Sequence, residues 1–385
     1  MKSLYPTLGD LSISHKLNKM RQKGHMLYKI ERLIDWSKIS ALLSKVDYPK
    51  TINGGSDAYS SMLIFRMLLI KKYYGLSTRQ LEEHVYCNIV FMDFCCAGLD
   101  TDIPDHSTLC RWEERFRKNN IFRDAFNEIN NQLNQKGIKI KDGMILDASI
   151  IESYSRPKKV TVIEEIPAVI EQSKLTETYN QESNEDKETS HGSSENKSDF
   201  QEIETSQKKY TVKTTYSSDP ASNWGFQNGF KFGLKSHTSV NRTGYVNGYF
   251  FTQANVNEVT CVEQMINIVK PAAGTYSSGD KDYESEKNDK LLEKYKLNNQ
   301  IMKKQKDKNN PDPLIIEKNK LISKSRFVVE RTIGTIKHGL GMGRARYKGI
   351  EKNENDWGLS CIVHNLIRGA NELFNIKTLN LLPNT

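Results

Sequence analysis

Three acidic residues stand at positions where a carboxylate is unusual, and their types would suit a metal ion. Asp147 is the one charged residue in the apolar run GMILDASII, and Asp280 ends the run AAGTYSSGD, for which we predict a strand. Glu330 is the single acid between Lys324 and Lys348, a stretch that carries seven Lys or Arg side chains. A buried carboxylate needs a partner, because as an unpaired ion it costs several kcal/mol.

Two aspartates on strands and a glutamate on a helix would form an oxygen-only ligand set, which suits Mg²⁺ or Mn²⁺ rather than zinc. Two such ions about 3.5–4 Å apart would clamp the attacking and leaving oxygens of a phosphodiester. Each acid also has an ordinary explanation: a salt bridge for Asp147, a turn for Asp280, and a pair with Arg326 for Glu330. Taken singly, the ordinary explanation of each aspartate is favoured.

The spacing around Glu330 predicts a helix with one charged and one apolar stripe. Arg326, Glu330 and Lys337 are spaced i, i+4 and i+11, which places them in one narrow stripe together with Ser323. We expect Arg326, Lys337 and Arg331 to neutralise phosphate charge beside Glu330. The neighbouring apolar stripe would seat the helix on a sheet; it consists of Val329, Ile333, Ile336 and Leu340.

Composition agrees with an anionic partner but does not demand one. The 385 residues carry a net charge of +9, which favours nucleic acid about as much as it favours a merely soluble basic protein. The six cysteines show no CxxC pair and no zinc spacing, as expected of reduced thiols in a cytoplasmic protein. The longest apolar run, MLIFRMLLI, is too short to span a membrane and predicts a buried helix.

Periodicity predicts an all-helical region followed by an α/β layout. Helices are expected to start at Ser77, with Gln80 completing a capping box, and after Pro104, capped by Asp105 or Ser107. From residue 140 onward the order is strand, hairpin, helix, strand, helix, strand, helix, which is typical of a mixed sheet with packed helices. The last two long helices are predicted over about 316–338 and 355–374.

These patterns divide the chain into parts of different composition. We predict a basic extension over 1–50, a helical DNA-binding domain over 51–138, and a tail over 376–385. A catalytic domain is expected over 139–157 and 213–375. It is interrupted by an acidic insertion over 158–212, which we predict to be disordered because residues 160–207 hold twelve acids, three bases and few aromatic side chains.

Several blocks of the sequence resemble the bacterial DDE insertion-sequence transposases, in particular the group numbered five within the larger group-four superfamily. The glutamate region of that family reads Tyr-x2-Arg-x3-Glu-x6-Lys, and Arg326, Glu330 and Lys337 keep its spacing. The segments MILDASIIES and GDKDYES resemble the regions of its first and second acids, Asp147 and Asp280 here. The resemblance covers about 50–375 apart from the insertion; the other blocks are LSTRQLEEHVYCNIVFMDFCCAGLDTDIPDHSTLCRWEERF, KFGLKSHTSVN, GYFFTQANVNE, GRARYKGIEKNEND and HNLIRGANEL.

This resemblance implies an RNase H-like core in which Asp147, Asp280 and Glu330 bind two Mg²⁺ or Mn²⁺ ions. It also implies binding of terminal inverted repeats and of target DNA, strand cleavage and strand transfer, and a homodimer on double-stranded DNA in a bacterial cytoplasm, associated with the nucleoid. Two positions depart from the family. Ser323 stands where Tyr is usual, and Asp282 stands where Gly or Ala is usual; Asp282 competes with Asp280, which we favour for its strand-end position.

Further DNA contacts are predicted outside the triad. Trp224 could stack on an unpaired base, although such a side chain more often packs in a core or loop. Backbone phosphates are expected to meet Lys281, Arg344, Arg346 and Lys348. The sequence is also compatible with two other functions: a metal-dependent DNA nuclease without strand transfer, and a catalytically decayed, transposase-derived DNA-binding protein.

Overall fold

The chain folds into two units, the larger comprising residues 1–154 and 221–385 and the smaller residues 155–220. The computed structural model describes residues 8–48, 58–165, 202–205, 208–216, 218–305, 307 and 309–374. The elements that carry the three acids all belong to the larger unit.

The first part of the larger unit is helical, as predicted. Ser77 and Gln80 form the expected capping box, and Asp105 caps the next long helix by accepting a hydrogen bond from the Thr108 backbone N–H. Both caps satisfy N–H groups that a helix start leaves without a partner. The elements are α1 (Leu8–Gln22), α2 (Met26–Leu33), α3 (Trp36–Leu43), η1 (Ser44–Val46), α4 (Ser61–Tyr74), α5 (Thr78–Cys87), α6 (Ile89–Phe94), α7 (His106–Lys118) and α8 (Ile121–Gln135).

A mixed sheet follows, in the order β5-β6-β1-β8-β9, with β7 also paired to β6 and β10 to β1. β6 runs antiparallel to β5, β7 and β1, whereas β8 runs parallel to β1 and to β9. This confirms the fold class that the sequence predicted, a mixed sheet with packed helices as in an RNase H-like core. The strands are β1 (Met144–Ser153), β5 (Asn223–Phe226), β6 (Phe230–Val240), β7 (Val246–Gln253), β8 (Tyr276–Gly279), β9 (Asn298–Ile301) and β10 (Arg344–Ala345).

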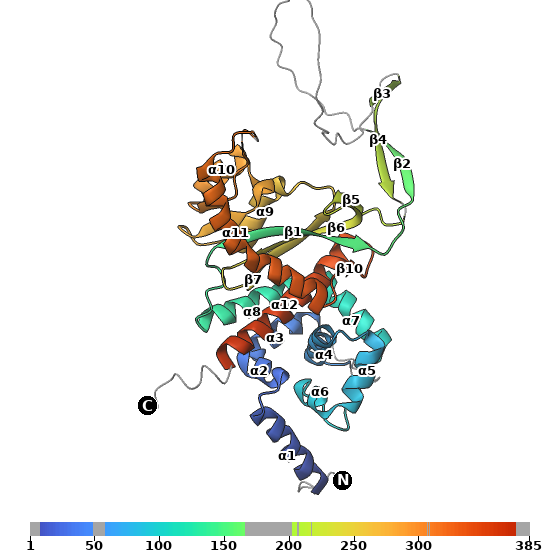
Figure 1. Cartoon of the computed structure of the whole chain (residues 1–385). Coiled ribbons are helices and arrows are strands. Elements are labelled where there is room, and N and C mark those ends of the chain that lie inside the picture. Colours follow the sequence, from blue (N-terminus) through green and yellow to red (C-terminus); the bar gives the residue numbers. More distant parts are fainter. Residues whose placement is uncertain are drawn as a thin grey trace, which may run out of the picture. The chain divides into compact units, whose positions relative to one another are not determined.

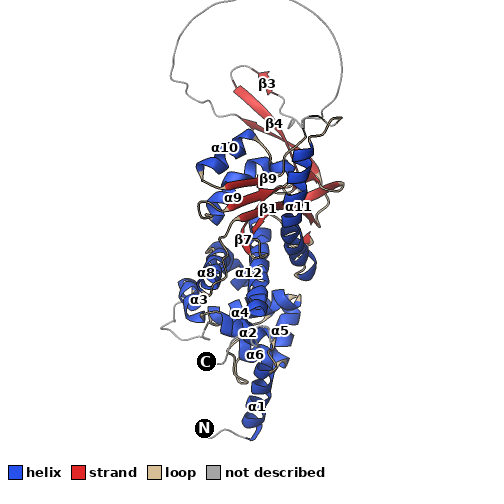
Figure 2. Cartoon of the chain, turned by 60° about the vertical axis from the view of Figure 1, so that its left-hand side comes forward, coloured by secondary structure: helices blue, strands red, loops and turns tan. Residues whose placement is uncertain are grey.

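Helices cover both faces of the sheet (Figure 2). On one face, α9 (Val262–Val269), preceded by η2 (Glu258–Cys261), and α10 (Glu286–Lys294) bury a cluster that includes Met144 and Leu146 of β1. On the other face lie α11 (Pro313–Gly334), its π-helical continuation η4 (Thr335–Gly339) and α12 (Ile350–Phe374). Because side chains alternate along a strand, Asp147 shares the α11 face with Ile145 and Ile151.

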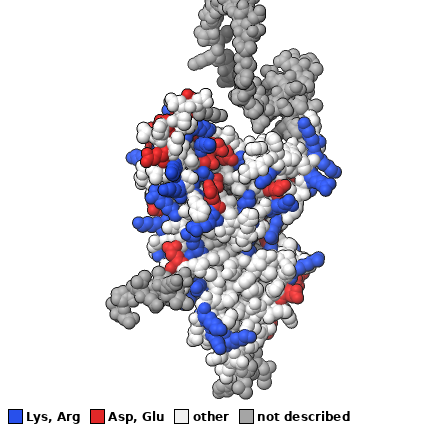
Figure 3. All heavy atoms as spheres, in the orientation of Figure 1, with Lys and Arg blue, Asp and Glu red and all other residues white. Residues whose placement is uncertain are grey.

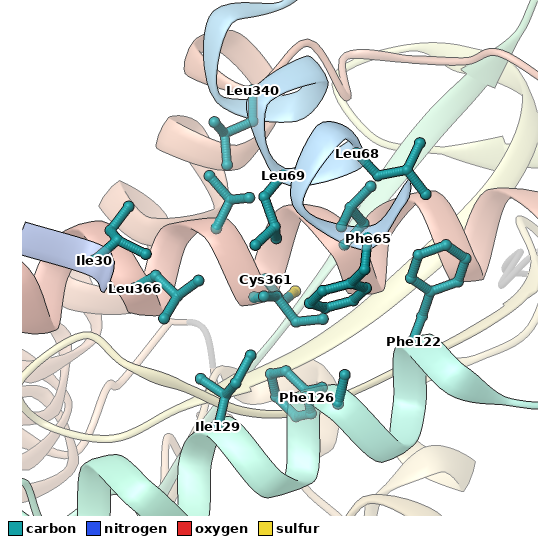
Figure 4. Close-up of a cluster of buried hydrophobic side chains, with 14 of the residues drawn as sticks. Ile30, Phe65, Leu68, Leu69, Phe122, Phe126, Ile129, Leu340, Cys361 and Leu366 are labelled. Carbon is teal, nitrogen blue, oxygen red and sulfur yellow. The ribbon is translucent and has the colours of Figure 1, made fainter. Parts of the chain in front are cut away.

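Helix α12 lies between the sheet and the N-terminal helices (Figure 1). Figure 4 shows side chains from α2, α4, α8 and α12 meeting in one cluster, with Phe65, Phe126 and Cys361 near its centre. Two polar groups join α12 to β7: Asn365 hydrogen-bonds both backbone groups of Val246, and Glu354 accepts from the Phe251 backbone N–H. The helical region and the sheet therefore share a core.

The smaller unit is a three-stranded antiparallel sheet in the order β2-β4-β3. Its strands are β2 (Lys159–Glu165), β3 (Glu202–Thr205) and β4 (Lys208–Tyr216). The prediction of disorder extended across these segments, but their Val, Ile, Thr and Tyr content favours strands. The rest of the predicted insertion, 166–201 and 206–207, lies outside the described residues, as do residues 1–7 and 375–385 at the ends.

Two expectations from composition can be compared directly with the structure. Each of the six cysteines, all within the described ranges, is free of a disulfide. In those same ranges, no helix combines the length and the apolar character that crossing a membrane requires. The run MLIFRMLLI forms most of α4 and is buried, as predicted.

Asn365 provides a test of the shared core. Its side chain is fully buried and hydrogen-bonds Asn130 of α8 as well as Val246. We predict that Asn365→Ala lowers the free energy of unfolding by roughly 2–4 kcal/mol, because the partners are left buried without hydrogen bonds. Urea unfolding would measure this. Asn355→Ala, on the same helix, is the control and should change stability by less than about 0.5 kcal/mol; equal effects of the two would contradict the shared core.

Candidate active site

Asp147 occupies the middle of β1, a strand hydrogen-bonded to neighbours on both edges. Its side chain is 19% exposed. Burial raises the pKa of this carboxyl to about 7, although Arg326 opposes the shift and Asp280 adds to it. A carboxylate in this position is stable as an anion only with a cation beside it.

Asp280 comes directly after β8, the parallel neighbour of β1. The parallel pairing of the two strands ends at Ile145 and Ser278. Two residues further along each chain, Asp147 and Asp280 contact the same nitrogen of Arg326. The Oδ1 of Asp280 accepts a hydrogen bond of 2.9 Å from the Asp282 backbone N–H, which starts the short helix η3 (Lys281–Tyr283). Burial also raises the pKa of Asp280, again against the effect of Arg326.

Glu330 reaches the same region from α11. That helix is capped by Asp312 and begins with Pro313, a residue suited to the first helical turn. The predicted apolar stripe is buried against the core, with Val329 and Ile336 fully enclosed, and α11 packs on β1 and β6. The Glu330 side chain lies at the margin of this contact and is 55% exposed.

The guanidinium of Arg326 joins the three acids. Its Nη2 lies 3.3 Å from Asp147 Oδ1, 3.6 Å from Asp280 Oδ2 and 4.0 Å from Glu330 Oε1. The Arg326 side chain is only 11% exposed. One cation therefore contacts carboxylates from a central strand, from the end of its parallel neighbour and from a helix. The same contacts do not include Asp282, the alternative second acid.

Between Asp147 and the pairing of Glu152 with β10, the edge of β1 opposite β6 is completed by two side chains rather than by a strand. Lys337 Nζ donates to Ser149 Oγ at 2.8 Å and to the Ile150 carbonyl at 3.0 Å. Gln227 donates to the Ala148 carbonyl and accepts from the Ile150 backbone N–H. Sequence reasoning expected Lys337 to face phosphate, and it missed Gln227, because a turn glutamine carries no distinguishing local signal.

The other predicted phosphate-binding cations lie on the surface. Lys281, Arg331, Arg346 and Lys348 are exposed, and the Arg331 guanidinium lies 5.3 Å from the ring centre of Phe327. Arg344 is also exposed, and its Nη2 lies 3.8 Å from Glu152 Oε2. On the face seen in Figure 3, charged side chains of both signs gather over the half that contains α10 and α11, while the lower half is largely uncharged.

Trp224 lies on β5 and is 40% exposed, with its ring 5.7 Å from that of Phe232. The turn beyond it carries two more exposed rings, Phe226 and Phe230, whose centres are 5.3 Å apart. His237, by contrast, is buried in the sheet, hydrogen-bonded to Thr252 and stacked on Phe250. The β5–β6 hairpin thus presents three exposed aromatic rings at this end of the sheet.

The oxygen donors of the three acids suit a divalent cation, although their side chains lie farther apart than ligands of one ion would. Within the part of the chain that the structure describes, no three His, Cys, Asp or Glu side chains approach closely enough to share a metal ion. The acids nonetheless converge on one positive charge. They offer only hard oxygen donors, and two of them have carboxyl pKa values raised by burial. Such a donor set suits Mg²⁺ or Mn²⁺.

Comparison with known families agrees with this geometry. Residues 15–115 match the family described as a transposase domain (DUF772), and residues 198–366 match the transposase DDE domain. The second match includes Asp280 and Glu330 and begins after Asp147. No solved structure matches the chain. The two matches cover most of the helical region, without α8, and every strand of the mixed sheet except β1. They show that the chain belongs to the insertion-sequence DDE transposases, enzymes that process DNA.

Proposed function

We propose that this transposase belongs to group five of the group-four superfamily, binds the terminal inverted repeats of its element, and cleaves and transfers DNA strands. The observation that carries the proposal is the convergence of Asp147, Asp280 and Glu330 on one guanidinium. Three carboxylates brought together from separate elements are costly unless a site needs them. The protein would act in a bacterial cytoplasm, associated with the nucleoid while bound to DNA.

In this proposal the three acids hold two divalent ions, Mg²⁺ or Mn²⁺. Ions bound there would supply the positive charge that activates a water or 3′-hydroxyl and stabilises the leaving oxygen. The chain's own part is to hold the ligands. Pairing with β6 would hold Asp147, and the end of β8 with the start of η3 would hold Asp280. The packing of α11 on β1 and β6 would hold Glu330, and Lys337 with Gln227 would secure β1 beside them.

The exposed cations are proposed to contact the DNA backbone. Lys281, Arg331, Arg346 and Lys348 have their charges at the surface, and each phosphate contact of this kind releases a counterion. Arg344 would join them, and the phosphate contacts of Arg326 and Lys337 stay predictions. We also propose a homodimer on DNA, because transposition pairs two element ends.

Cleavage of a DNA fragment that carries the gene's own flanks tests the proposed chemistry. We predict discrete cuts that require Mg²⁺ or Mn²⁺ and are absent in EDTA. Glu330→Gln should reduce the cleavage rate at least about 100-fold, because it removes one ligand charge while keeping the side-chain shape. DNA binding should persist. The matched control is Glu317→Gln, an exposed acid on the same helix, which should cleave as wild type does.

The outcomes separate the rival functions. Joined products in which a cut strand is linked to target DNA indicate transposition, whereas cuts without joining indicate a nuclease. Tight binding without cleavage by the wild type would indicate a DNA-binding relic. Cleavage by Glu330→Gln at the wild-type rate would contradict the role of Glu330.

A second prediction contrasts a half-buried and an exposed lysine. Lys337→Met should lower the free energy of unfolding by roughly 1.5 kcal/mol, because Ser149 and Ile150 lose a charged donor. Lys348→Met should leave stability within about 0.5 kcal/mol of wild type. It should instead reduce the slope of log binding affinity against log salt concentration by about one, as expected for the loss of one phosphate contact. Unfolding curves and binding titrations at several salt concentrations would measure both; reversed behaviour of the two variants would contradict these positions.

A third prediction concerns Trp224, which we propose stacks on unpaired bases at a DNA end. Trp224→Ala should weaken binding to a duplex with a short unpaired end by about 1–3 kcal/mol. Binding to the fully paired duplex should hardly change. Trp224→Phe keeps an aromatic ring and should retain most of the affinity. Fluorescence anisotropy would measure the affinity of the wild type and of both variants for the two DNAs. An equal loss of affinity of Trp224→Ala for both DNAs would argue against stacking.

A further inference from the structure

Arg326 is placed unusually for a residue that is meant to grip DNA. Its charge points into the protein, toward Asp147, Asp280 and Glu330, and its side chain is 11% exposed. A phosphate-binding arginine is expected at the surface, as Arg346 is. In the present arrangement Arg326 instead supplies the positive charge at the point where three negative charges converge.

That positive charge has an evident physical task. Carboxylates that share a partly buried site repel each other, and desolvation adds to the cost of their ionised forms. Burial raises the pKa of both aspartates, and Arg326 acts against that shift in each case. Arg326, which contacts all three acids, therefore helps to keep them compatible with folding while no divalent cation is bound.

The contacts of Arg326 are nevertheless poor for a permanent salt bridge. Charge-assisted hydrogen bonds to carboxylates are typically about 2.7–2.9 Å long and, for arginine, often paired. Here one nitrogen, Nη2, makes contacts of 3.3, 3.6 and 4.0 Å. Within the described residues, the buried Nε has no hydrogen-bond partner, and Nη1 reaches only Met302 Sδ at 4.0 Å. The guanidinium is held by charge more than by directed hydrogen bonds.

We propose that Arg326 is a built-in counter-ion of the acidic triad, which a divalent cation displaces on binding. The inference rests on the proposed function, in which the triad binds metal. Once displaced, the guanidinium is free to turn toward a phosphate. By thermodynamic linkage, a phosphate that holds Arg326 away from the triad also strengthens cation binding. Arg326 is thus a positioning residue that couples loading of the site with cation to the presence of DNA.

The test uses Mn²⁺ alone as the probe, with the full-length protein and no DNA. Binding is followed by electron paramagnetic resonance of the free ion and by calorimetry. Arg326→Gln should bind Mn²⁺ about tenfold more tightly than wild type, as expected when a charged competitor is removed. Lys320→Gln, which removes an exposed cation from the same helix, should leave the affinity unchanged. Unchanged or weaker Mn²⁺ binding by Arg326→Gln would overturn the proposal.

Thermal unfolding separates this role from a purely structural one. In EDTA, Arg326→Gln should melt below wild type, because the carboxylates lose their counter-ion, and saturating Mn²⁺ should remove the difference. A structural salt bridge would instead leave the variant less stable with and without Mn²⁺, which would count against displacement.

A measurement on the wild type does not depend on the variant folding. Phenylglyoxal modifies accessible guanidinium groups, and mass spectrometry identifies the modified residue. Mn²⁺ should speed the modification of Arg326, because displacement exposes a side chain that is otherwise 11% exposed. Equal or slower modification in Mn²⁺ would overturn the proposal.

Asp280→Asn distinguishes failure of this inference from failure of the proposed function. If this variant abolishes Mn²⁺ binding and metal-dependent cleavage while Arg326→Gln shows no gain in affinity, only the counter-ion role is wrong. If no Mn²⁺ site depends on Asp280, the metal triad itself is wrong and the counter-ion role falls with it.

Discussion

The structure depends on neutralising two aspartates, one on β1 and one directly after its parallel neighbour β8. Just beyond the ladder between β1 and β8, Asp147 and Asp280 contact the same nitrogen of Arg326, in surroundings that raise the pKa of both carboxyl groups. Their charge has to be met locally, because little solvent reaches it. Arg326 meets it in the present structure, and in the proposed reaction divalent ions would take over that task.

The rest of the larger unit can be understood as support for this arrangement. Helix α11 brings both Arg326 and Glu330 to the strands through one buried apolar stripe, and α12 fixes the same face of the sheet to the N-terminal helices. Gln227 and Lys337 complete the part of the β1 edge that has no neighbouring strand. The three acids lie on or directly beside strands and helices rather than on long loops, so they are held with little freedom.

Patterns that depend on local chemistry were predictable from the sequence. An acid in an apolar strand, an acid at a strand end and the stripes around Glu330 identified the elements that converge, and the caps at Ser77 and Asp105 identified helix starts. The contacts of Lys337 were harder to predict, because the direction of its side chain was taken from the angular spacing of a regular α-helix. The chain is π-helical from Thr335, and a π-helix has a different angular spacing between residues. The contact of Gln227 with β1 depends on how a hairpin folds back, which local sequence does not encode.

The central claim is that Asp147, Asp280 and Glu330 form one divalent-cation site. Anomalous scattering from crystals grown with Mn²⁺ tests it most directly, because it locates the ion independently of activity. We predict peaks for two ions among the three carboxylates, at about 2.0–2.6 Å from their oxygens, with the Arg326 guanidinium moved away. Mn²⁺ bound elsewhere, with Arg326 still between the acids, would contradict it.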